Sequence, residues 1–120
     1  MITPTGRTFE NKAVRILRRS GLQILVRNFS ARTGEIDIIA LEGEQLVFVE
    51  VRARSNPAFS SAAGSVDRRK QRRILNTARR FLQEHPELAN LPCRFDVVAF
   101  EPPQSATERR VNWIRSAFTA

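Results

Sequence analysis

The stretch "EIDIIALEGEQLVFVEVRAR", residues 35–54, decides how this chain folds. Its two apolar, β-branched halves predict strands at Glu35–Leu41 and from Leu46 onward, and the polar segment with a glycine between them predicts a turn. The second strand nevertheless carries Glu50 between two valines, and Arg52 follows it. Burying a carboxylate is unfavourable by several kcal/mol unless something pairs with it. Glu50 therefore indicates that this strand does more than pack.

The residues before this stretch predict a helix and one further strand. Apolar residues at helical spacing indicate a helix over Thr8–Ser20, with Thr8 as its N-cap and Gly21 as its stop. A strand is expected from Leu22 to about Asn28, followed by a polar connection, Phe29–Gly34. Three strands joined by links this short predict an antiparallel meander.

The residues after the stretch predict a loop, a long helix and two more strands. Ser55–Ser65 is small and polar, as is typical of a surface loop, and a helix is expected from Ser65 or Val66 to about Glu84. Strands are expected at Cys93–Phe100 and within Arg110–Phe118. The order α-β-β-β-α-β-β, with the long helix as a crossover between parallel strands, predicts an α/β fold with a mixed sheet flanked by helices. Its length indicates one domain, residues 1–120.

The charge of the chain predicts a polyanionic partner. Twenty Lys and Arg residues against 12 acidic ones give a net charge of +8 and a pI near 11.5. Such a balance favours nucleic acid first and an anionic membrane surface second. No apolar run of membrane length and no signal-peptide core is visible, so we expect a cytoplasmic protein without a membrane partner. The lone cysteine, Cys93, excludes an internal disulfide and is expected to be a small buried residue.

The second predicted helix concentrates positive charge, with seven of the 20 Lys and Arg residues. Apolar residues there, Ile74 to Leu82, would anchor one side on the sheet and leave the cations outside. A helix surface of one charge sign predicts phosphate contacts, whereas the alternative is a solvated face. The residues expected to bind nucleic acid are Arg68, Arg69, Lys70, Arg72 and Arg73, with Arg79 and Arg80 further along.

Strand alternation brings several charged side chains to one face. If the hairpin loop is Glu42–Gln45, Asp37 lies opposite Glu50, whereas a shorter loop would place Glu35 opposite Glu50. Either register leaves the polar residues on one face and the apolar residues on the other. The polar set is Glu35, Asp37, Glu50 and Arg52, and the apolar set is Ile36, Ile38, Val47, Val49 and Val51.

Two neighbouring carboxylates are unfavourable without a counterion, and Mg²⁺ is a cation that such a pair can hold. A bound Mg²⁺ could act on a phosphodiester, with Arg52 stabilising charge on the phosphate. The alternative from spacing alone is a salt-bridge set of Asp37, Glu50 and Arg52 at the rim of the sheet.

The motifs "GEID" and "FVEVR" resemble the D…(D/E)xK signature of restriction-endonuclease-like nucleases. Five ordered blocks extend the resemblance over nearly the whole chain: "GRTFENKA", "ILVRNFSARTGEIDIIA", "LVFVEVRAR", "VDRRKQRRILNTARRFL" and "RFDVV". Together they resemble the YraN family, which has the restriction-endonuclease-like fold and is similar to Holliday junction resolvases. The resemblance implies an endonuclease that uses Mg²⁺ or Mn²⁺ on structured or branched DNA, and it implies a homodimer.

The resemblance also implies roles for individual residues. Asp37 and Glu50 match the metal-binding acids, and Glu10 on the first helix matches a glutamate that completes the cluster. Arg52 stands where the signature has lysine, and arginine does not lose its proton to act as a base. This departure keeps a second interpretation open, a non-catalytic DNA- or RNA-binding module with a degenerate nuclease site. Lys70 could substitute for the missing lysine, but the sequence does not bring it to Glu50.

Other polar residues have structural interpretations. Arg94 and Asp96 lie two apart in one strand and are expected to form an ion pair. His85 precedes a proline at a helix end and is expected to be a capping or surface residue.

Overall fold

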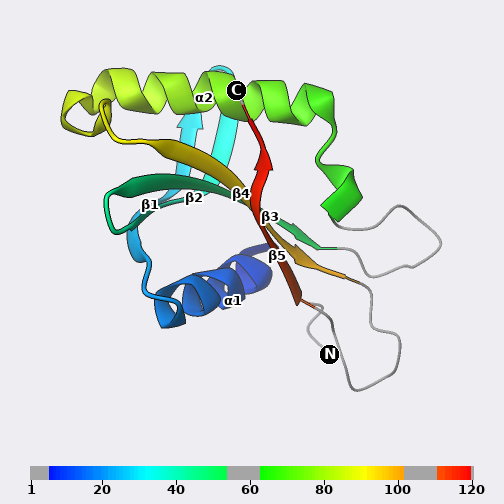
Figure 1. Ribbon diagram of the computed structural model, residues 1–120. Coiled ribbons are helices and arrows are strands. Elements are labelled where there is room, and N and C mark those ends of the chain that lie inside the picture. Colours follow the sequence, from blue (N-terminus) through cyan, green and yellow to red (C-terminus); the bar gives the residue numbers. More distant parts are fainter. Residues whose placement is uncertain (1–5, 54–62, 102–110, 120) are drawn as a thin grey trace.

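The computed structural model describes residues 6–53, 63–101 and 111–119. Two helices lie on opposite sides of a five-stranded sheet (Figure 1). The elements in chain order are α1 (Gly6–Arg19), β1 (Gln23–Ala31), β2 (Gly34–Glu42), β3 (Gln45–Ala53), the 3₁₀ turn η1 (Ala63–Ser65), α2 (Arg68–Glu84), the 3₁₀ turn η2 (Pro86–Leu88), β4 (Cys93–Phe100) and β5 (Val111–Phe118).

The sheet is mixed, with strand order β1-β2-β3-β4-β5. The first three strands form an antiparallel meander, β3 and β4 are parallel, and β5 returns antiparallel to β4. A parallel neighbour needs a crossover connection, and α2 lies within it. The α/β class and the order α-β-β-β-α-β-β are therefore as predicted, in agreement with the restriction-endonuclease-like fold.

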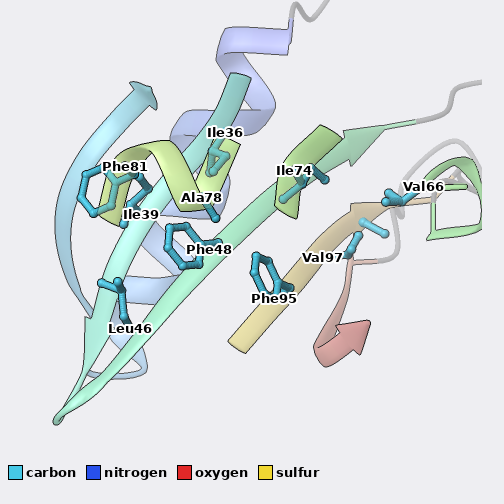
Figure 2. Packing of buried hydrophobic residues seen from close by; sticks show 11 residues of the cluster. Ile36, Ile39, Leu46, Phe48, Val66, Ile74, Ala78, Phe81, Phe95 and Val97 are labelled. Atoms are coloured by element: carbon cyan, nitrogen blue, oxygen red, sulfur yellow. The ribbon is translucent and has the colours of Figure 1, made fainter. Parts of the chain in front are cut away.

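The sheet buries both of its faces. On one face, α2 contributes Ile74, Ala78 and Phe81 to what we call the α2-side core, and Figure 2 shows these side chains with Phe48 and other sheet residues. On the other face, α1 covers what we call the α1-side core. Its fully buried members include Ala13, Leu17, Ile38, Ala40, Val47 and Val98. A strand buried on both faces reads as a continuous apolar run, which explains the composition of β3.

The ends of α1 differ in part from the prediction. The helix begins at Gly6, so Thr8 lies inside its first turn and is not the N-cap. Its C-terminus is as predicted, because Gly21 adopts a φ of 93° that L-residues rarely reach. The amides of Gly21 and Leu22 then bond the carbonyls of Arg18 and Leu17 and close the helix.

The second helix begins slightly later than expected, at Arg68. Asp67 caps it, because the Asp67 side chain accepts a hydrogen bond from the Lys70 amide at 2.9 Å. Ser65 belongs to the preceding 3₁₀ turn, and most of the predicted loop Ser55–Ser65 lies outside the described residues. His85 follows α2 as its C-cap, as expected.

Two further expectations are corrected. The connection predicted at Phe29–Gly34 is mostly strand, because Ser30 and Ala31 continue the pairing of β1 with β2 as far as the turn. Cys93 is exposed and not buried, since it is the first residue of β4 and precedes the buried part of that strand.

Candidate functional site: a carboxylate pair beneath a basic helix

The β2–β3 hairpin places Asp37 beside Glu50. Its register pairs Leu41 with Leu46 and Glu42 with Gln45, so counting outward sets Asp37 opposite Glu50. The predicted alternative, with Glu35 opposite Glu50, is therefore wrong. The regular pairing of β2 with β3 ends one residue before Asp37 and Glu50, at Ile38 and Val49. There the Val51 amide donates to Asp37 Oδ2 at 2.8 Å, which fixes the carboxylate between the two strands.

The alternation of β2 breaks at Asp37. Ile38 belongs to the α1-side core and Ile39 to the α2-side core, yet Ile36 also belongs to the α2-side core. The prediction that Ile36 shares a face with Ile38 is therefore wrong. Asn28, the residue of β1 opposite Asp37 in the register, has a φ of 55° inside a strand. This left-handed residue locally distorts the strand pair and explains the break.

Glu50 is an electrostatically strained carboxyl group. Its relative exposure is 5%, and its Oε2 atom has no hydrogen-bond partner among the described residues. Burial, together with the neighbouring Asp37 carboxylate, raises the pKa of Glu50 to about 8, although Lys70 and Arg52 act in the opposite direction. A buried oxygen without a donor, next to a second carboxylate, fits a hard divalent cation. Asp37 and Glu50 are the residues that would hold it.

Two cations lie near the Oε1 atom of Glu50, the oxygen opposite the Oε2 atom that has no partner among the described residues. Arg52 Nη1 lies 3.8 Å and Lys70 Nζ 3.9 Å from Glu50 Oε1. Arg52 Nε also donates to Ser65 Oγ at 2.8 Å, which ties β3 to the turn before α2. The site therefore contains a lysine, although the strand position of the family signature does not.

Sequence reasoning did not bring Lys70 to Glu50, but the spacing of α2 contained the signal. Ile74, Thr77, Ala78 and Phe81 are the buried residues of the helix. Lys70 lies four residues before Ile74 and so continues the buried stripe by one turn toward the N-terminus. A lysine at this position of α2 points toward the sheet, where Glu50 lies.

The cations at the start of α2 surround an open pocket of about 330 Å³. It is lined by Arg52, Ser65, Asp67, Arg69, Lys70 and Arg73. Among the described residues that line it, Asp67 is the only carboxylate, and Asp67 already accepts a hydrogen bond from the Lys70 amide as the helix cap. Since Arg52 and Lys70 also flank Glu50, this pocket adjoins the carboxylate pair. We call it the first basic pocket.

The predicted nucleic-acid-binding residues differ in exposure. Arg68, Arg69, Arg72 and Arg73 are exposed, whereas Lys70 is half-buried against Glu50. Lys70 therefore differs from the other four predicted nucleic-acid-binding residues, because it is less exposed and lies against Glu50.

Glu10 is buried on α1 and contacts β1. It accepts hydrogen bonds from Arg27 Nε and Asn28 Nδ2, both at 3.0 Å. Within residues 6–53, 63–101 and 111–119, no three His, Cys, Asp or Glu side chains are grouped closely enough to hold a metal. Of the described residues, Glu10, Asp37 and Glu50 therefore do not form one three-carboxylate group. Glu35 is exposed and lies opposite Ser30.

The fold and the site define a class of protein: small α/β proteins with a mixed sheet, a carboxylate pair on two neighbouring strands and a basic helix above it. The sequence matches the family described as "Uncharacterised protein family UPF0102" over residues 9–100. The chain therefore belongs to this family, which is also the YraN family.

Relatives extend the similarity over nearly the full chain. A UPF0102 protein of Stutzerimonas stutzeri is 48% identical over 95% of this chain and 93% of its own length. UPF0102 proteins of Alcanivorax borkumensis and Saccharophagus degradans are also 48% identical, over 95% and 96% of this chain and 90% and 92% of their own lengths. In the part of the chain that the structure covers, neither helix is long and apolar enough to span a membrane.

Proposed function

We propose that this protein is a nucleic-acid-binding endonuclease that uses Mg²⁺ or Mn²⁺ and acts on structured or branched DNA. The observation that carries the proposal is the Asp37–Glu50 pair, with a buried oxygen that lacks a donor in the described structure, beside a pocket of cations. A stable fold alone does not need like charges side by side, since buried charges are normally paired with opposite ones.

The chain's own residues would each do one part of the work. Asp37, held by the Val51 amide, and Glu50 would hold the metal ion. When bound, the ion would polarise the phosphodiester and lower the pKa of a water molecule. Arg52 would bind a non-bridging phosphate oxygen, because its guanidinium is always charged and offers planar donors.

Lys70 would supply the titratable amine that Arg52 cannot supply. Its ammonium lies 3.9 Å from Glu50, next to the place where the metal and the phosphate would meet. A lysine can orient a water molecule or exchange a proton with it, whereas arginine stays protonated. Lys70 therefore supports catalysis at a site whose strand signature carries arginine.

The arginines of α2 would bind the phosphates around the cut. Arg68, Arg69, Arg72 and Arg73 present four exposed cations, and the net charge of +8 would draw a polyanion toward them. Binding of this kind weakens steeply with salt because counterions are released. A DNA partner, a cytoplasmic location, a homodimer and a contribution of Glu10 to the metal site remain part of the proposal.

The second candidate function is a non-catalytic DNA- or RNA-binding module. Arg52 at the lysine position favours it, because that replacement preserves phosphate binding and removes the strand's proton-transfer group. The two functions share the basic helix and differ in what Asp37, Glu50 and Lys70 do.

A cleavage assay separates them. Junction, flap and duplex DNA would be incubated with Mg²⁺ or Mn²⁺ and the wild type, Asp37→Asn, Glu50→Gln, Lys70→Ala or Arg18→Ala. Arg18 is an exposed cation at the end of α1, on the opposite side of the sheet, so its variant controls for lost charge. Metal-dependent cutting by the wild type that, among the variants, only Arg18→Ala retains supports the enzyme. Binding without cutting by the wild type supports the module, and cutting by Asp37→Asn and Glu50→Gln at the wild-type rate contradicts the assigned site.

A further inference from the structure

A second basic pocket lies at the other end of α2. It has a volume of about 440 Å³ and is lined by Ser30, Ala31, Arg32, Thr33, Arg80 and Glu84. Arg32 is exposed at the β1–β2 turn, and Arg80 is exposed on the helix. Glu84 accepts a hydrogen bond from Arg80 Nε at 3.1 Å and neutralises part of the pocket, which keeps a net positive charge. A surface with this charge and these donors suits a phosphate group.

A hydrogen bond connects α2 to the β1–β2 turn. Thr33 and Thr77 share a hydrogen bond between their hydroxyl oxygens at 2.7 Å, and Thr77 also donates to the Arg73 carbonyl at 2.8 Å. Gly34 has a φ of 145°, and a Cβ there would lie 3.5 Å from the Thr77 hydroxyl. Because Thr77 is fully buried, its hydrogen bond with Thr33 holds α2 over the turn. The separation of the two basic pockets is therefore also fixed.

One side of α2 connects the two pockets. Arg69, Arg73 and Arg80 follow each other at spacings of four and seven residues, which places them on the same side of a helix. Arg69 and Arg73 line the first basic pocket and Arg80 lines the second. At a rise of about 1.5 Å per residue, the Cα atoms of Arg69 and Arg80 lie about 16 Å apart. Along the axis of a B-form duplex that distance equals about five steps at about 3.4 Å of rise per step, and an extended single strand covers it with fewer phosphates because its backbone is not coiled around an axis.

We infer that the sugar–phosphate backbone of one nucleic-acid strand follows this side of α2, from the first basic pocket beside Glu50 to the second pocket at Arg32 and Arg80. The inference rests on the proposed function, because the first pocket would hold the phosphate nearest the carboxylate pair. A trinucleotide, whose two internucleotide phosphates are one step apart, would fill only one pocket. A longer strand would contact Arg32 and Arg80 as well.

The test compares DNA strands of three and twelve nucleotides, bound without divalent metal and measured by fluorescence anisotropy over a range of salt concentrations. The variant Arg32→Ala/Arg80→Ala removes the two cations of the second pocket. Its matched control, Arg18→Ala/Arg19→Ala, removes two exposed cations from the end of α1, on the opposite side of the sheet. Arg32→Lys/Arg80→Lys keeps both charges and checks that the fold tolerates substitution.

The expected result depends on strand length. Arg32→Ala/Arg80→Ala weakens binding of the twelve-nucleotide strand and lowers its salt slope by about 1.4, at about 0.7 per lost phosphate contact. The same variant leaves binding of the three-nucleotide strand unchanged, and the lysine variant binds both strands like the wild type. Equal effects on the two strands, or no effect beyond the control, would overturn the strand path alone. A wild type that binds neither strand would overturn the proposed function and the path together.

Discussion

Two buried polar clusters lie on opposite faces of the sheet, one centred on Arg94 and Asp96 of β4 and the other on Asp37 of β2 and Glu50 of β3, and they differ in how their charges are paired. Phe95 and Val97 pack into the α2-side core, so Arg94 and Asp96 point to the α1 side. There Arg94 Nε donates to both oxygens of Asp96, at 3.0 and 3.1 Å. Asp96 also accepts from Trp113 Nε1 and from a β5 amide, both at 3.0 Å.

The remaining charges of this first cluster are also matched. Arg94 Nη1 donates to Glu42 at 2.6 Å, and Arg115 Nη1 donates to both Glu42 oxygens. Hydrogen bonds from Arg94 and Arg115 lower the pKa of Glu42, while Asp96 and Glu42 raise the pKa of Arg94. Arg94 Nη2 lacks a partner in the described structure, but two carboxylates balance the charge of its guanidinium.

The second cluster, the carboxylate pair on the α2 side, has charges that are paired less closely. Asp37 and Glu50 face each other, the cations near Glu50 are 3.8 and 3.9 Å away, and the pKa of Glu50 is raised to about 8. The charges of the first cluster are balanced by close hydrogen bonds, whereas Glu50 has only the two longer ion pairs and a raised pKa. Buried charge alone therefore does not mark a functional site, and a buried carboxyl that is paired this loosely is a candidate for one.

The largest expected effect is the loss of a compensated charge. Asp96→Ala leaves Arg94 buried without its main partner and should lower the free energy of unfolding by about 3–5 kcal/mol. Urea denaturation at pH 7 measures this change. A loss below about 1 kcal/mol would mean that the first cluster does not hold the sheet together, and the comparison would fail.

The next effect is a gain in stability from removing the uncompensated charge. The raised pKa means that the folded chain keeps a proton that the unfolded chain releases. The Glu50 contribution is therefore complete below about pH 4.5 and is lost as the pH rises toward 8. Glu50→Gln should remove this dependence and exceed the wild type by about 2–4 kcal/mol at pH 9 without metal. Parallel pH–stability curves for the two proteins would contradict the raised pKa.

A smaller effect is expected from Lys70. Its ammonium favours the charged form of Glu50, so Lys70→Ala should move the titration of Glu50 to higher pH. Because Lys70 is about one-third exposed, the accompanying loss of stability at pH 9 should stay near or below about 1 kcal/mol. Carbon-detected NMR of the Glu50 carboxyl follows the titration directly. Arg72→Ala, an exposed cation of the same helix, should leave it in place, and equal shifts in both variants would exclude a specific role for Lys70.

The smallest effect is expected where a charge pair is exposed. Arg80 and Glu84 form an i,i+4 pair on α2, with side chains 61% and 48% exposed. Glu84→Ala should change the free energy of unfolding by about 0.3–0.5 kcal/mol, again by urea denaturation. A change comparable to that of Asp96→Ala would show that burial does not separate these ion pairs.

Much of this fold was predictable from local patterns in the sequence. The hairpin turn and the apolar runs around it predicted the β2–β3 pair, and counting from a Glu42–Gln45 loop predicted Asp37 opposite Glu50. The face of Ile36 was not predictable by alternation, because it depends on the left-handed backbone of Asn28 on a neighbouring strand. The unusual backbone of this one residue therefore decides which face of the sheet Ile36 packs on.

The contents of the site were less predictable, because they depend on how the helices sit on the sheet. Glu10 was expected among the acids, but its hydrogen bonds go to Arg27 and Asn28, which only the packing of α1 against β1 could reveal. Lys70 approaches Glu50 because the phase of α2 turns it inward. The buried stripe carried that information, whereas the distance between helix and strand was a tertiary property.

The most direct test of the central claim, that Asp37 and Glu50 form a divalent metal site, is a calorimetric titration of Mn²⁺ into the metal-free protein at pH 8.5. At that pH Glu50 is mostly ionised, so proton release does not mask binding. We predict one site in the wild type, its loss in Asp37→Asn and Glu50→Gln, and its retention in Glu42→Gln, which alters the compensated cluster. No binding by the wild type, or equal binding by all four proteins, would contradict the claim.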